Sequence, residues 1–221
     1  MNSHLTTFQK RPISPSCLTS WYDEFNKDPN HEKWARHYLL GEKSVHDDET
    51  QERMEKGTAV HERLAKDPKF LPTVPRYDSF EDEFFTSYGT IPLTGKLDTL
   101  RADLHAFCDY KTTQSDNYWS QSKANKNIQF LFYFLLLYLK FDIRPEDVDC
   151  KIAVIHLNQK NRVEIFTVKH SMLKIVEFLG ELKDVHAEMC KFAKKYVPPT
   201  NDVVKPTPKV VKLNYKALKI K

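Results

Sequence analysis

The stretch Ile128–Leu139 constrains the fold most, because it is apolar on nearly every side of a helix. It is too short to span a bilayer, which takes about 20 residues, and lysines flank it on both sides. A helix that is hydrophobic all round has to be buried inside a protein. We therefore predict a long core helix from about Lys123 to Lys140, and no membrane partner for the chain.

Further helices are expected on both sides of this run. Ser14-Pro15 is a typical N-cap and first turn. An apolar stripe at i, i+3, i+4 and i+7 follows it: Leu18, Trp21, Tyr22 and Phe25. The other expected helices cover about 31–40, from the acidic residues at 47–49 to Asp67-Pro68, and 171 to about 196.

Strands are expected in two groups. The first group covers 77–88, 91–101 and 105–111, separated by turn residues. The second covers 149–157 and 162–168. The order of helices, three strands, helix, two strands and helix predicts one α/β domain over 1–197. Its core would be a central mixed sheet of about five strands flanked by helices.

The positive charge is concentrated in the last 24 residues. Residues 198–221 hold six lysines and one aspartate, a charge of +5, so the rest of the chain carries about −1 of the net +4. We expect a basic, flexible tail there. It suits a polyanionic partner such as nucleic acid, and equally a terminus that is merely solvated.

The cysteines form no C-x-x-C pair and lie far apart: Cys17, Cys108, Cys150 and Cys190. The first residues are polar and carry no apolar run typical of a secretion signal. We therefore expect reduced, structural thiols in a protein that is not secreted. Its setting would be cytoplasmic, or a nucleoid or viral replication site.

The segment Asp109-Tyr110-Lys111 is the first to indicate chemistry. Residues two apart on a strand share a face, so Asp109 and Lys111 should lie side by side. Antiparallel pairing across the turn at 102–103 would bring Asp98 close to Asp109. Two neighbouring carboxylates repel unless a cation lies between them, and Mg²⁺ prefers oxygen ligands. A lone D-x-K is more often an ordinary ion pair on a solvated strand, so the other motifs in the chain decide between an ion pair and a metal site.

Together with four other motifs, this segment resembles the PD-(D/E)XK nuclease superfamily. Within that superfamily the chain is similar to the RecB-like branch, which includes lambda-type, CRISPR-associated and mitochondrial genome-maintenance exonucleases. The resemblance covers residues 13 to 170, and its motifs follow the family order S-x-S-x-L, G-x-x-x-H, G-x-x-D, D-x-K-T and Q-x-x-x-Y. The matching segments are Ser14-Pro15-Ser16-Cys17-Leu18, Gly57-Thr58-Ala59-Val60-His61, Gly95-Lys96-Leu97-Asp98, Asp109-Tyr110-Lys111-Thr112 and Gln129-Phe130-Leu131-Phe132-Tyr133.

The resemblance implies a role for each of these residues. His61, Asp98, Asp109 and the backbone carbonyl of Tyr110 would bind Mg²⁺ or Mn²⁺. Lys111 would be the catalytic lysine, acting with Asp98 and Asp109. The alternative for His61 is a core histidine, but its offset from Gly57 and the downstream acids favour a ligand. The family's cysteine grouping is absent, so we expect no iron–sulfur cluster.

Other polar and aromatic residues are candidates for contacts to the substrate. Gln129 and Tyr133 lie one turn apart and would contact the substrate strand or the catalytic loop, unless Gln129 is only a core amide. The remaining candidates are Thr112, Ser16 and Trp119 with its neighbour Tyr118. The two aromatic rings could stack on unpaired bases or anchor a loop. Glu81 or Glu83 could supply a further carboxylate or lie on a solvated edge, and Lys123 and Lys126 could contact phosphates.

Together these features predict a metal-dependent deoxyribonuclease. We expect an exonuclease on single-stranded DNA or duplex ends in replication, recombination or repair, because no separate domain is available for base readout. Any helicase or single-strand-binding partner would be another chain. The alternatives are a structure-specific or nicking endonuclease with the same site, and a catalytically silent nucleic-acid-binding module.

Overall fold

The sheet and helices are those of an α/β domain. The computed structural model describes residues 8–27, 31–159 and 162–197, so the basic tail lies outside the described residues. The helices are α2 (Pro15–Lys27), α3 (Glu32–Tyr38), α4 (Asp48–Lys66), α5 (Gln121–Lys126), α6 (Ile128–Phe141) and α7 (Met172–Lys195), with a short 3-10 turn at Pro145–Asp147. The strands are β1 (Ser79–Tyr88), β2 (Ile91–Leu100), β3 (Ala106–Thr113), β4 (Asp149–His156) and β5 (Arg162–Val168).

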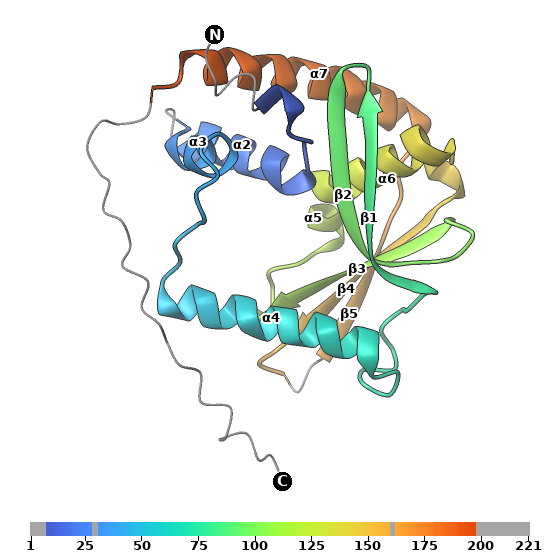
Figure 1. Cartoon of the computed structure of the whole chain (residues 1–221). Helices are drawn as coiled ribbons and strands as arrows, with labels where there is room; N and C mark the ends of the chain where they lie inside the picture. Colours follow the sequence, from blue (N-terminus) through green and yellow to red (C-terminus); the bar gives the residue numbers. More distant parts are fainter. Residues whose placement is uncertain (1–7, 28–30, 160–161, 198–221) are drawn as a thin grey trace.

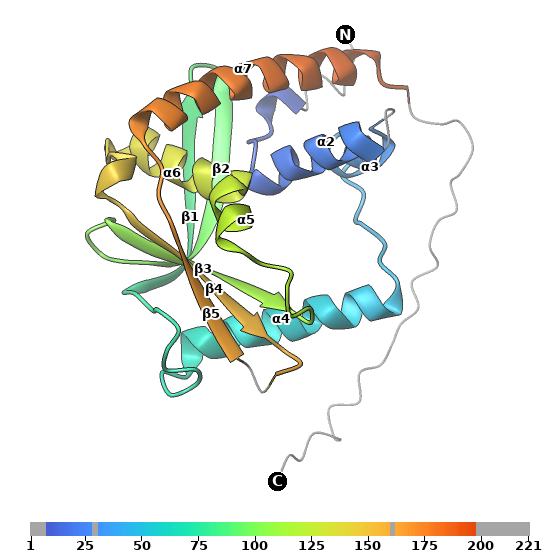
Figure 2. The same cartoon turned by 180° about the vertical axis from the view of Figure 1, so that it is seen from behind.

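The five strands form one mixed sheet in chain order, which confirms the predicted fold class. All neighbours are antiparallel except β3 and β4, which run parallel. The parallel pair follows from the chain order, since the connection between these two strands contains a helix. Figures 1 and 2 show α7 along one side of the molecule and α4 along the opposite side, with the sheet between them.

Helix α6 lies at the centre of the core, as its sequence predicts. Every residue from Phe130 to Leu137 is buried. The helix packs on β1 and β2 and also against α2 and α7, so no side of this central run faces water. Within the described ranges, no helix is both long and apolar enough to cross a membrane.

The single helix predicted over 123–140 is wrong in one respect, because it is two helices that meet at Asn127. The backbone of Asn127 is extended, and its side chain accepts a hydrogen bond from the Gln129 N–H at 2.9 Å. Asparagine is a favoured N-cap because its side chain satisfies an otherwise unpaired N–H. This cap places Gln129 in the first turn of α6, facing the sheet.

The ladder between β2 and β3 is short, and its end creates the site. The two strands pair only at Thr99–Cys108 and Leu100–Phe107. At the next step the Asp98 carboxylate takes the place of a backbone partner, since it accepts the Tyr110 N–H at 2.6 Å. Asp98 therefore lies where the two strands separate.

Two glycines should respond to alanine in opposite directions. A Cβ on Gly95 would lie 2.5 Å from Leu136 Cδ1 and 3.3 Å from Tyr133 Cε1, whereas a Cβ on Gly180 in α7 would meet nothing within 4 Å. We expect Gly95→Ala to lower the free energy of unfolding by about 1–3 kcal/mol through overpacking. Gly180→Ala should raise it by about 1 kcal/mol through helix propensity. Urea unfolding of both variants measures the two changes in free energy. A change in the same direction in both variants would contradict the expectation.

Candidate active site

Three elements bring the predicted catalytic residues together. His61 comes from α4, Asp98 from β2, and Asp109 and Lys111 from β3. His61 Nδ1 lies 3.6 Å from Asp98 Oδ1, and Lys111 Nζ lies 2.8 Å from Asp109 Oδ2. The antiparallel pairing expected across the turn at 102–103 is also present. Residues separated by up to 50 positions in the sequence thus form one cluster.

Asp109 is the most deeply buried member, with 2% of its side chain exposed. Gln129 Nε2 donates to Asp109 Oδ1 at 3.1 Å and to the Tyr133 hydroxyl at 2.7 Å. The Gln129 amide group therefore has a partner for each of its hydrogens. Together with Lys111 on the other oxygen, these contacts fix the Asp109 carboxylate.

The electrostatics of this carboxylate are unusual for a strand residue. Burial raises the pKa of Asp109 to about 6, the Lys111 charge opposes this rise, and the nearby Asp98 charge adds to it. Burial also raises the pKa of Tyr133 well above its usual range, so its hydroxyl keeps its proton. The two carboxylates of Asp98 and Asp109 thus carry more negative charge than the single ammonium group of Lys111 neutralises.

His61 reaches the cluster because α4 lies close to β3. A Cβ on Gly57 would lie 2.9 Å from Thr112 Oγ1, so this glycine permits the approach that its place in the motif predicts. Leu64 on the same face is buried. Met54, one turn before Gly57, is 51% exposed and lines the larger of two hollows described below. The His61 ring packs edge-on against Tyr110 at 5.7 Å.

The donor set suits a divalent cation. Among the described residues, one ligand atom each from His61, Glu81 and Asp98 lies within 4.8 Å of the others. An imidazole nitrogen together with carboxylate oxygens is a donor set that divalent cations accept. Asp109 lies beside this group, with its oxygens toward Lys111 and Gln129. Glu81 is the member that the sequence left undecided against Glu83.

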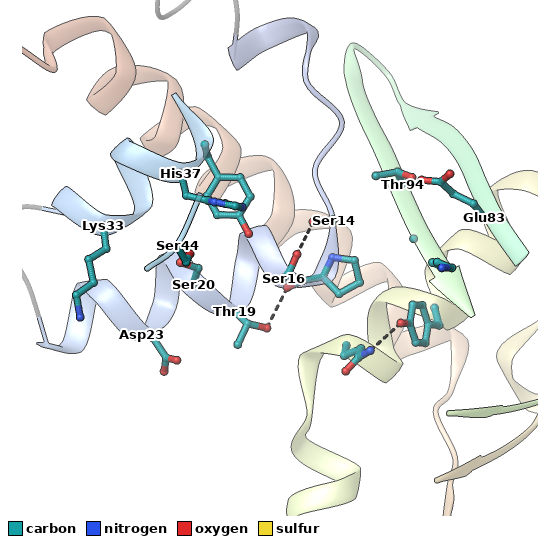
Figure 3. Close-up of a pocket in the computed structure, with 16 residues that line it drawn as sticks. Ser14, Ser16, Thr19, Ser20, Asp23, Lys33, His37, Ser44, Glu83 and Thr94 are labelled. Carbon is teal, nitrogen blue, oxygen red and sulfur yellow. Dashed lines mark hydrogen bonds between the residues drawn. The ribbon is translucent and has the colours of Figure 1, made fainter. Parts of the chain in front are cut away.

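Two hollows flank the cluster. The larger, of about 1100 Å³, is lined by α4, the end of β3 and the loop after it, and includes His61 and Lys111. The smaller, of about 700 Å³, lies between α2, α3 and the β1–β2 hairpin, and includes Gln129. Figure 3 shows hydroxyls at the start of α2 opposite Glu83 and Thr94 of the hairpin. The larger hollow thus opens onto the cluster itself, whereas the smaller one is linked to it through Gln129, which bonds Asp109.

The predicted substrate contacts divide between these hollows. Ser16 and Tyr133 join Gln129 in the smaller one, and Thr112 lines the larger one. Trp119 is not among the lining residues of either, because its ring packs partly buried against the core.

The neighbouring aromatic ring does face a hollow. Tyr118 lines the larger one, is 56% exposed, and has Lys123 Nζ 3.0 Å from its ring centroid. The partly buried Trp119 therefore suits the alternative of a loop anchor, whereas Tyr118 is the aromatic residue exposed in the larger hollow.

Comparison with known proteins gives likenesses of fold only. No family model and no curated protein matches the chain. Solved structures with a similar arrangement include SSO0001, at 12% identity and TM-score 0.46 over 88% of this chain and 86% of that one. Another is a candidate exonuclease from Eubacterium rectale, at 12% identity and TM-score 0.42 over 85% and 71%. A third is a phage-related exonuclease from Haemophilus somnus 129PT, at 15% identity and TM-score 0.42 over 88% and 91%. Scores at this level assign no residue roles.

Proposed function

We propose that this chain is a divalent-metal-dependent nuclease that hydrolyses phosphodiester bonds in DNA. The observation that carries the proposal is the convergence of His61, Asp98, Asp109 and Lys111 from three elements. The buried Asp109 carboxylate beside the half-buried carboxylate of Asp98 would be unfavourable in a purely structural role, but the two suit a site that binds a cation. The larger hollow leaves His61 and Lys111 accessible to a polymer.

The residues would divide the chemistry as follows. His61, Asp98, Asp109 and the Tyr110 carbonyl would hold Mg²⁺ or Mn²⁺, which when bound activates a water and neutralises phosphate charge. Lys111, which is 27% exposed and lines the larger hollow, would orient that water or stabilise the developing negative charge. Gln129 would be a positioning residue, since it holds Asp109 and is held by Tyr133.

We further propose an exonuclease that acts on single strands or duplex ends. The described part of the chain forms one sheet with its helices, which leaves no separate module to read a base sequence. The exposed side chain of Tyr118, with the Lys123 ammonium beside its ring, suits contact with an unpaired base and its phosphate. Replication, recombination or repair is the setting we propose.

A panel of DNA substrates tests this proposal. End-labelled linear single strands, linear duplexes and closed single-stranded circles are incubated with Mg²⁺, Mn²⁺ or EDTA. We expect metal-dependent loss of the linear substrates and intact circles. Cleavage of circles would instead support a structure-specific or nicking endonuclease, and no cleavage of any substrate with either metal would contradict a nuclease.

A further inference from the structure

The β1–β2 hairpin is irregular at one step, and this step lies at the candidate metal site. The strands pair regularly at Phe80–Thr99 and again at Asp82–Leu97. Between these pairs Glu81 faces Asp98 without pairing, and Glu81 has a φ of +62°. A non-glycine residue in the left-handed region is strained, and such strain is common at functional sites.

The hairpin joins the rest of the sheet directly after this step. The buried positions of β2 alternate from Ile91 to Thr99, and Leu100 is buried as well. Thr99 and Leu100 are also the two residues of β2 that pair with β3. One part of the hairpin packs on α6 and the other joins β3, and Figure 1 shows the hairpin turning away from β3–β5 there. The bend brings the Glu81 carboxylate within 4.8 Å of ligand atoms of His61 and Asp98.

The Glu81 carboxylate already has a cationic partner. Lys96 forms an ion pair with it, and the two side chains are 54% and 47% exposed. Lys96 also lines the smaller hollow beside Gln129, so its ammonium group has open space to move into. Lys96 thus balances the charge of a carboxylate that also lies beside the candidate ligands His61 and Asp98.

We propose that Glu81 is a further metal ligand and that Lys96 is its exchangeable counter-ion. The inference rests on the metal site of the proposed function. When no cation is bound, Lys96 balances the charge of Glu81. When one is bound, Glu81 faces it, and Lys96 is free to take a phosphate in the smaller hollow. Lys96 and the metal therefore compete for one carboxylate.

This competition gives the two substitutions opposite signs. Loss of a ligand should weaken Mn²⁺ binding by about tenfold or more. Loss of the competing ammonium should strengthen it by about two- to fivefold, which corresponds to the usual strength of an exposed ion pair. An ordinary cross-strand ion pair with no link to a metal predicts no change in either case.

The test is calorimetric titration of the full chain with Mn²⁺ alone, without DNA. We expect weaker binding in Glu81→Gln, tighter binding in Lys96→Met, and in the double variant the affinity of Glu81→Gln. Glu83→Gln, on the same strand but lining the smaller hollow, is the matched control and should bind as wild type. Glu81→Gly relieves the positive φ and should still lose affinity, which separates charge from backbone strain.

Two results would overturn the inference: wild-type affinity in Glu81→Gln, or weaker binding in Lys96→Met. Asp98→Asn distinguishes this from failure of the proposed function. If Asp98→Asn loses Mn²⁺ while Glu81→Gln keeps it, the metal site stands and only the role of Glu81 falls. A wild-type chain that binds no Mn²⁺ contradicts both.

Discussion

Replacing Lys111 with alanine should lower kcat for DNA cleavage by about 100- to 1000-fold, the loss typical of one preorganised charge-stabilising group. The ammonium lies 2.8 Å from Asp109 and faces the larger hollow, so its removal leaves the polymer's route open. DNA binding should therefore change little. Rates measured at saturating substrate, with binding measured by anisotropy in Ca²⁺, test both halves of the expectation.

The chain supplies its own control for this variant. Asp149-Cys150-Lys151 on β4 repeats the D-x-K pattern, and Lys151 Nζ lies 2.9 Å from Asp149 Oδ2. These two side chains are 43% and 32% exposed and have no link to His61 or Asp98 in the described structure. Lys151→Ala should cleave as wild type. Full activity in Lys111→Ala, or equal losses in both variants, would contradict the proposed mechanism.

The same pair of patterns shows what sequence can and cannot predict about this site. Local spacing places Asp109 beside Lys111 and Asp149 beside Lys151 equally well. Only tertiary packing separates them, because α6 covers the first pair and presents Gln129 to it. The resemblance to a nuclease family singles out the first pair, whereas spacing alone could not.

The elements of the fold were more predictable than the irregular steps between them. The apolar run of α6 and the strand-like runs separated by turn residues are strong local signals, and the core helix and the five-stranded sheet they predict are both confirmed. Asn127 was missed because an asparagine between helix-forming residues resembles a tolerated interior position until its side chain is seen to cap Gln129. Glu81 was undecided because regular alternation cannot predict a strand residue with positive φ.

Asp109→Asn should abolish cleavage and at the same time stabilise the metal-free protein. The substitution removes a carboxylate that is 2% exposed, while Lys111, with 27% of its side chain exposed, can turn to water. Asparagine keeps an oxygen for the Gln129 amide. Because burial raises the pKa of Asp109 to about 6 from 3.8, the gain in unfolding free energy at pH 7 is on the order of 1–3 kcal/mol.

The direction of the pH dependence follows from the raised pKa. The folded state holds the Asp109 proton more tightly than the unfolded state, so wild-type stability is lost as the pH rises from about 4 to about 6. The variant lacks this loss, and its advantage in EDTA should therefore be largest at pH 7 and vanish near pH 4. Asp149→Asn, with an exposed carboxylate, should show no such gain.

Mn²⁺ should reverse this advantage, because a ligand stabilises only the protein that binds it. The wild type gains stability with each increase in Mn²⁺ above its dissociation constant, whereas Asp109→Asn, with one anionic ligand fewer, gains less. Melting temperatures in EDTA and in rising Mn²⁺ should therefore cross. A variant that is no more stable than wild type in EDTA would argue against a charge strained by burial. An equal rise in melting temperature with Mn²⁺ in both proteins would show that Asp109 does not bind the metal. A buried carboxylate that binds a cation should lower the stability of the metal-free protein and raise its affinity for the metal.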